Sequence, residues 1–106
     1  MNYLDLAIKY QKQAQYKQAE ALYIKIISEN KNNFIALSNL GVIYGSQGQW
    51  EKLIRFSKLA LEIKPSHLES ILNIGYALIN LGRNNEAIEI LSNQLNADPK
   101  NDQLYS

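Results

Sequence analysis

Several residue types that commonly carry chemistry are rare or missing in this sequence. Its 106 residues include no cysteine and a single histidine, which excludes disulfides, thiolate catalysis and cysteine-rich zinc sites. The charges nearly cancel, at 11 Lys+Arg against 10 Asp+Glu, whereas binders of nucleic acid or anionic membranes carry a strong basic excess. The start has no secretion-signal pattern, and no apolar stretch approaches the roughly 18 residues of a membrane span. We therefore expect a cytoplasmic protein that binds neither nucleic acid nor membrane.

The remaining composition is that of one folded domain. Apolar residues make up 46% of the chain and charged residues 20%, which is ordinary for a globular protein. A chain of this length forms a core without disulfide or metal support. We expect a single domain over residues 1–106.

The sequence repeats itself with a period of 34 residues. Gly41 and Gly75 are separated by this distance, and so are Pro65 and Pro99. An internal period of this size is typical of a repeat architecture. The register gives three units, residues 1–33, 34–67 and 68–101, and a remnant, 102–106, that resembles the start of a further unit.

Each unit contains two stretches with the apolar spacing of an amphipathic helix. The units break near their middle, at Gly48, Gly82 and, more weakly, Ala14, where glycine supplies the backbone that ends a helix. Pro65 then separates the second unit from the third, because proline cannot continue a helix interior. We predict six helices, over residues 2–14, 17–30, 34–47, 50–63, 68–81 and 84–96.

The pattern within the period resembles the tetratricopeptide repeat. In the second unit a Leu40–Gly41 pair is followed three residues later by Tyr44, then by the small Ala60 in the second helix and by the closing Pro65. The resemblance covers nearly the whole chain. It implies an all-α fold, a right-handed α-solenoid of three helix-turn-helix repeats, which acts as a non-enzymatic protein-interaction module.

Small residues recur where the two helices of a unit should approach closely, at Ala7, Gly41 and Gly75. A large side chain at these positions would hold the helices apart. Leu53 and Ser57 depart from the pattern, since the family has a small residue and an aromatic one there.

These two departures predict local repacking in the second unit. We expect Phe56 and Leu59 to compensate for them.

One column of polar residues lies on the first helices, which line the concave, ligand-binding surface in the resembled family. It contains Asp5, Asn39 and Asn73. In family members such as kinesin light chains, asparagines in this column hold the backbone of an extended peptide, and a primary amide can do so because it offers both donor and acceptor. The alternative is that two asparagines share a column by chance, because the chain is rich in asparagine.

Apolar residues occupy the neighbouring columns of the same helices, and exposed apolar surface on a concave face usually marks a binding site. The alternative is that they pack against the second helices or a neighbouring segment. We expect the groove to bind an extended or amphipathic peptide of a partner protein. The apolar candidates are Leu4, Ile8, Ile35, Val42, Leu72, Tyr76 and Ile79.

The chaperone-tail binders of this family hold two carboxylates with lysines, asparagines and an arginine. The matching positions in this sequence are Leu4, Ile8, Asn39, Glu69 and Asn73. Only Asn39 agrees, and Glu69 would repel an acidic peptide.

Nothing in the sequence favours an enzyme, a cofactor or a metal site. His67 follows Pro65 directly and is expected to be a surface residue where a helix begins. Ser66 and Glu69 match a capping box, with Ser66 as the N-cap. Phosphate-binding loops and metal-ligand spacings are absent.

Three other functions remain to be weighed. No polar helix is expected to cover the apolar residues Ile88, Leu91 and Leu95 of the last helix. Either the chain is part of a longer protein, such as an enzyme with this domain as its regulatory part, or another molecule covers this face. Self-association by stacking of the ends is therefore the main alternative, and a basic first unit beside an acidic third would suit it. An RNA-binding repeat of the pentatricopeptide type is disfavoured by the regular period and the balanced charge.

Overall fold

The computed structural model describes residues 2–97, and all regular secondary structure within that range is helical. The helix bounds lie within two residues of those predicted from the sequence, so the predicted arrangement of six helices is confirmed. The elements are α1 (Tyr3–Lys12), α2 (Tyr16–Glu29), α3 (Phe34–Ser46), α4 (Trp50–Ile63), α5 (Leu68–Asn80) and α6 (Asn84–Ala97).

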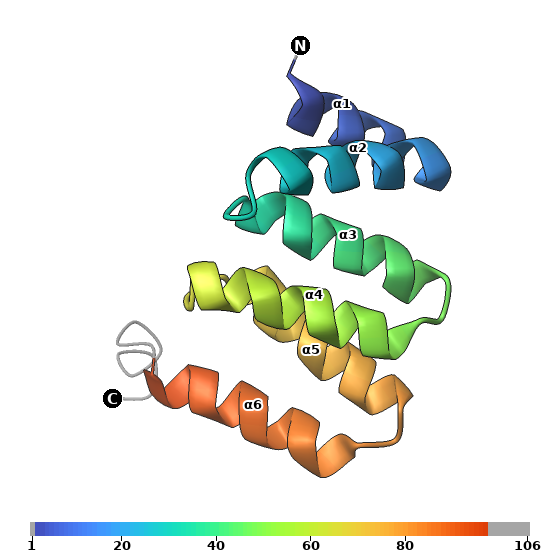
Figure 1. Ribbon diagram of the computed structural model, residues 1–106. Helices are drawn as coiled ribbons and strands as arrows, with labels where there is room; N and C mark the ends of the chain where they lie inside the picture. Colours follow the sequence, from blue (N-terminus) through green and yellow to red (C-terminus); the bar gives the residue numbers. More distant parts are fainter. Residues whose placement is uncertain (1, 98–106) are drawn as a thin grey trace.

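The helices stack in chain order into an α-solenoid (Figure 1). In addition to its sequence neighbours, the backbone of α3 lies close to those of both α1 and α5, whereas among the described residues the backbones of the second helices α2, α4 and α6 do not approach one another. The first helices therefore form the inner, concave side. The radius of gyration is 14.7 Å, against about 13 Å for a compact domain of this length, as expected for an elongated stack.

The turn inside each repeat has the same hydrogen-bonded geometry. Ala14, Gly48 and Gly82 take the left-handed conformation, with φ of 59°, 75° and 77°. In each turn the amide of the following residue donates to a carbonyl five residues earlier, at 2.8–2.9 Å, which is the Schellman ending of a helix. Glycine fits this conformation without strain, whereas Ala14 places a β-carbon in it.

The small residues of the repeat lie where helices meet. A β-carbon on Gly41 would lie 3.2 Å from Cβ of Phe56, and one on Gly75 would lie 3.3 Å from Cδ1 of Leu91. Ala7 is fully buried. The prediction of close helix approach at these positions is therefore confirmed.

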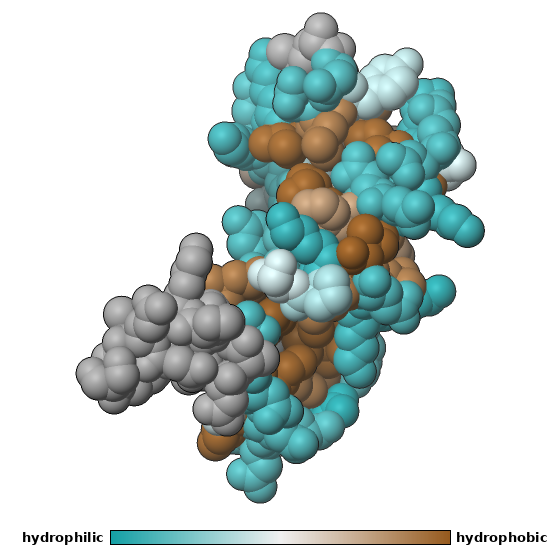
Figure 2. Space-filling view, turned by 90° about the vertical axis from the view of Figure 1, so that its left-hand side faces the viewer, coloured by the Kyte–Doolittle hydropathy of each residue, from teal (hydrophilic) through white to brown (hydrophobic). Residues whose placement is uncertain are grey.

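The core consists of two clusters of buried side chains. One joins α1, α2 and α3, and the other joins α4, α5 and α6. Figure 2 shows hydrophobic residues at several levels of the stack, set between hydrophilic ones. The first core cluster contains Ala7, Ala19, Tyr23, Ile26, Ala36, Leu40 and Ile43, and the second contains Leu53, Ile54, Ile74, Ala77, Leu78 and Ala87.

The start of α5 differs from the predicted capping box. The N-cap is His67 and not Ser66, because the helix begins at Leu68. The His67 side chain is only 12% exposed, so the expectation of a surface histidine was wrong. Its Nδ1 is 2.7 Å from Oγ of Ser70, and its ring lies edge-on against Phe34. These contacts give His67 a packing role at the junction between repeats.

Candidate functional site

Helix α5 presents a row of exposed apolar side chains. Their spacing of three or four residues places them on one face of the helix. This row, which we call the α5 stripe, consists of Leu68, Leu72, Tyr76 and Ile79, exposed by 54%, 50%, 58% and 54%. Val42 on the adjacent α3 is 37% exposed and lies beside Tyr76 in a common pocket.

The remaining predicted apolar residues are less accessible. Leu4 and Ile8 on α1 are half-buried and pack against the first core cluster, and Ile35 on α3 is half-buried as well. The exposed apolar surface of the concave side is therefore concentrated on α5 and the adjacent part of α3.

The first two members of the polar column have different surroundings. Asp5 is exposed in the first turn of α1. Asn39 is half-buried, and its side chain lies near the hydroxyl of Tyr23, a fully buried residue of α2. Burial raises the pKa of Tyr23, and the hydrogen bond with Asn39 opposes that rise. The same hydroxyl donates to Oε1 of Gln11 at 2.5 Å, so Asn39 belongs to a network within the protein.

One period later, the partners that hold Asn39 are absent. Gly45 stands where the first repeat has Gln11, and Ser57 stands where it has Tyr23. No side-chain hydrogen bond of Asn73 is found within the described residues, and Asn73 lines a pocket of about 250 Å³ on the concave side. Leu53 and Tyr76 line the same pocket.

Leu53 accounts for the absence of a side chain at position 45. A β-carbon on Gly45 would lie 2.8 Å from Cδ2 of Leu53, so the large residue at 53 requires a glycine opposite it. The predicted repacking in the second unit is present, but Gly45 makes the room for it. Phe56 instead packs against Tyr44, with 5.4 Å between ring centroids, and Leu59 is half-buried on α4.

Sequence reasoning missed two parts of this site. Leu68 extends the α5 stripe by one turn, and its spacing of four residues from Leu72 was the available signal. The pocket at Gly45 was missed because two differences between the repeats must be considered together. Gln11 and Tyr23 of the first repeat are replaced by Gly45 and Ser57 in the second.

Neither a metal site nor a membrane span is found in the part of the chain that the structure describes. No group of three or more histidine, aspartate or glutamate side chains there is placed to hold a metal ion. None of the six described helices is long and apolar enough to cross a membrane.

Comparison with protein families identifies the repeat. The tetratricopeptide repeat matches residues 36–68 and again residues 68–101, together more than half of the chain. A curated relative, the small glutamine-rich tetratricopeptide repeat-containing protein 2 of Mycosarcoma maydis, is 32% identical over 89 residues, which cover 84% of this chain and 25% of that protein. The chain spans 10% to 60% of the length of the curated relatives it matches.

Two solved structures have the same fold. A crystal structure of MamA gives a TM-score of 0.87 at 24% identity, with 95% of this chain and 59% of that chain covered. The second tetratricopeptide repeat domain of Spaghetti (RPAP3), bound to the HSP90 peptide SRMEEVD, gives a TM-score of 0.82 at 21% identity, with 91% and 89% covered. At these identities the likeness shows the fold alone.

Proposed function

The chain belongs to the tetratricopeptide repeat family, generally a non-catalytic protein-interaction fold, and we propose that its concave face binds an extended or amphipathic peptide of a partner protein. The observation that carries this proposal is the α5 stripe beside the amide of Asn73. Leu72 and Tyr76 are at least half exposed, and contiguous exposed apolar side chains on a concave surface are typical of binding sites.

The chemistry of the site suits a peptide. The Asn73 amide can donate to a backbone carbonyl and accept from a backbone amide, whatever the sequence of the ligand. Two such hydrogen bonds contribute about 2 kcal/mol. Burial of two or three ligand side chains at about 1.5–3 kcal/mol each would bring the total near the roughly 8 kcal/mol of a micromolar complex.

The residues around the pocket indicate which peptides would bind. Its lining, Val42, Gly45, Ser46, Leu53, Asn73 and Tyr76, carries no charge. Apolar ligand side chains are therefore favoured over charged ones, because burial of an unpaired charge is costly.

An acidic peptide like the one bound to the RPAP3 domain is not favoured. Leu4, Ile8 and Glu69 occupy positions where the chaperone-tail binders of the family carry other residues, mainly cations. An acidic side chain would find no cation there, and Glu69 is exposed on α5.

A displayed library of random peptides tests the proposal without knowledge of the partner. Peptides selected on the native protein are labelled, and their dissociation constants are measured by fluorescence anisotropy. We expect Asn73→Ala and Tyr76→Ser each to weaken binding by about tenfold, which corresponds to 1.4 kcal/mol. Ile24→Ser is the matched control, because Ile24 is 50% exposed on the second helix α2.

Equal weakening by Ile24→Ser, or full affinity in both concave variants, would contradict groove binding. Helicity of each variant, measured by circular dichroism, separates loss of binding from loss of fold.

Self-association is a second candidate function. Ile88 on α6 is 63% exposed, whereas Ile54, its equivalent on α4, is 7% exposed beneath the following repeat. Stacking of a second copy on α6 would bury Ile88 in the same way. Sedimentation equilibrium should then show a molar mass that rises with concentration and that Ile88→Glu returns to the monomer value. A monomer at all concentrations would refute it.

A further inference from the structure

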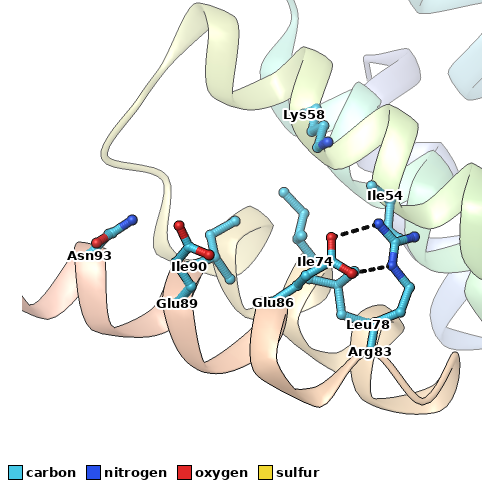
Figure 3. A pocket seen from close by; sticks show the side chains of 9 residues that line it. All are labelled: Ile54, Lys58, Ile74, Leu78, Arg83, Glu86, Glu89, Ile90 and Asn93. Atoms are coloured by element: carbon cyan, nitrogen blue, oxygen red, sulfur yellow. Dashed lines mark hydrogen bonds and ion pairs between the residues drawn. The ribbon is translucent and has the colours of Figure 1, made fainter.

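A second cleft lies between α4 and α6, and Figure 3 shows it from close by. Four of its nine lining residues are apolar, and the other five are charged or polar. Ile54 from α4, Leu78 from α5 and Ile90 from α6 are among the residues that line it, together with Ile74. Its volume is about 280 Å³. A cavity of about 150 Å³ already holds a benzene molecule, so the cleft has room for an aromatic ring.

The same place between α2 and α4 is filled by the protein itself. One period before Leu78 and Ile90 the chain has Tyr44 and Phe56. Their rings lie 5.4 Å apart, and both side chains pack against the first core cluster. The cleft between α4 and α6 is thus open because a leucine and an isoleucine stand where two aromatic rings fill the preceding one.

Two equivalent positions on α4 and α6 carry opposite charges, although Glu20 also lies near Tyr44 and the cleft is also lined by Lys58 and Arg83. Lys52 lies over the ring of Tyr44, at 4.7 Å from its centroid, and Arg55 lies over the ring of Phe56, at 5.9 Å. One period later these positions hold Glu86 and Glu89. An aromatic ring in the open cleft would therefore lie near the carboxylates of Glu86 and Glu89, whereas the rings of Tyr44 and Phe56 lie near Lys52 and Arg55.

The two carboxylates differ in availability. Arg83 donates two hydrogen bonds to Glu86, at 2.5 and 2.8 Å, and this pairing lowers the pKa of Glu86. Glu89, one turn further along α6, makes no ion pair within the described residues. Lys58 lies on the opposite, α4 side of the opening, as Figure 3 shows. A base brought by a partner would thus be attracted to the α6 side, at Glu89.

We propose that the cleft between α4 and α6 binds an aromatic side chain of a partner protein that carries an adjacent basic residue. The ring occupies the space that Tyr44 and Phe56 fill one period earlier, on Ile54, Leu78 and Ile90. The basic group pairs with Glu89. This site is separate from the concave groove and does not depend on what the groove binds.

A nuclear magnetic resonance titration with the blocked dipeptide acetyl-Phe-Arg-amide tests the proposal. Resonances of the isoleucine methyl groups report the place of binding. We expect ring-current shifts at Ile54, Ile74 and Ile90, and none at Ile79 on the concave side. Acetyl-Ala-Arg-amide should produce no such shifts, and acetyl-Phe-Glu-amide should bind more weakly than the arginine probe.

Two variants locate the interaction. Leu78→Tyr/Ile90→Phe gives the cleft the residues of the preceding one and should abolish the shifts. Glu89→Arg should weaken binding about two- to fivefold, as expected for an exposed ion pair. Absence of shifts on the native protein, equal shifts with the alanine probe, or shifts confined to Ile79 would each overturn the proposal. These outcomes need only the native protein, so the test stands even if the double variant fails to fold.

Discussion

The two junctions between repeats are built on the same register but are packed differently. At the first junction, between α2 and α3, Tyr23 is fully buried and joins Gln11 to Asn39. At the second, between α4 and α5, the positions of Gln11 and Tyr23 hold Gly45 and Ser57. Around Asn39 the first junction is closed by its own side chains, whereas the second leaves a concave pocket of about 250 Å³ beside Asn73.

This difference separates the structural use of a repeat position from its binding use. Asn39 and Asn73 occupy equivalent positions, but only Asn39 lies near a tyrosine of the preceding repeat, because Ser57 replaces that tyrosine one period later. A polar group whose bonds are satisfied inside the protein contributes to stability, and one that faces a pocket is available to a ligand. At the equivalent position, the first junction therefore uses its asparagine inside the protein, and the second leaves its asparagine at a pocket.

Replacement of the central residue of the first junction should have the largest effect. Tyr23→Ser removes a fully buried ring and leaves Gln11 and Asn39 without their shared partner. We expect the free energy of unfolding to fall by about 3–5 kcal/mol, as for other buried aromatic residues. Urea denaturation followed by circular dichroism measures it.

The matched variant Tyr23→Phe keeps the ring and removes the hydroxyl. It should cost about 1 kcal/mol, because the hydrogen bond of the hydroxyl with the half-buried Gln11 is lost. A loss below about 1 kcal/mol for Tyr23→Ser would show that the first junction is not closed by this residue.

Placing the residues of the first junction at the equivalent positions of the second should weaken peptide binding in the groove. The triple variant Gly45→Gln/Leu53→Ala/Ser57→Tyr reproduces the residues of the first repeat at the equivalent positions. The tyrosine should then engage Asn73, and the glutamine should fill the pocket. Peptides selected on the native protein are expected to bind about tenfold more weakly, or 1.4 kcal/mol, in fluorescence anisotropy.

Unchanged affinity in a folded triple variant would show that the pocket is not part of the binding surface. A thermal melt confirms the fold, and Ile24→Ser again serves as the control for exposed apolar surface.

The second junction also carries a polar atom without a partner. Ser57 is fully buried, and its Oγ makes no hydrogen bond within the described residues. Ser57→Ala removes that atom and should raise the free energy of unfolding by about 1 kcal/mol, the lower end of the cost of an unsatisfied buried group.

Ser70 provides the matched control for this prediction. It is equally buried, but it bonds with His67 and Ser38, so Ser70→Ala should lower stability by about 1 kcal/mol. The two substitutions are chemically identical and should differ in sign in parallel urea denaturations. Equal destabilisation by both would show that Ser57 has a partner.

The fold could be predicted from the sequence because its signals repeat. The 34-residue period places every turn and every close helix contact three times, so a weak signal such as Ala14 is read beside Gly48 and Gly82. The start of α5 at Leu68 was predicted correctly, but its N-cap was assigned to Ser66 instead of His67. The two residues are adjacent, and the packing of the His67 ring on Phe34 is not visible in a local pattern.

The candidate site could be predicted only in part. The sequence places Asn39 and Asn73 in one column, but their difference depends on residues in other helices, such as Tyr23 and Gly45. Burial of Leu4 and Ile8 against the first core cluster is likewise a tertiary property. Periodicity identifies which side chains share a face, whereas exposure depends on what the neighbouring repeat places against that face.

The smallest expected effect concerns the turn of the first repeat, which is the strained member of an otherwise equivalent set. Ala14 has a φ of 59° where the later turns have glycine, and the left-handed conformation costs an L-residue roughly 1–2 kcal/mol. Glycine removes that strain but gains freedom in the unfolded chain, worth about 0.4–1 kcal/mol. Ala14→Gly should therefore stabilise the protein by about 0.5 kcal/mol, and Gly48→Ala, its mirror in the second repeat, should destabilise it. Urea denaturation of the two variants measures both changes in the free energy of unfolding. A loss of stability in Ala14→Gly would mean that the first turn is not strained and that the repeats differ only at their junctions.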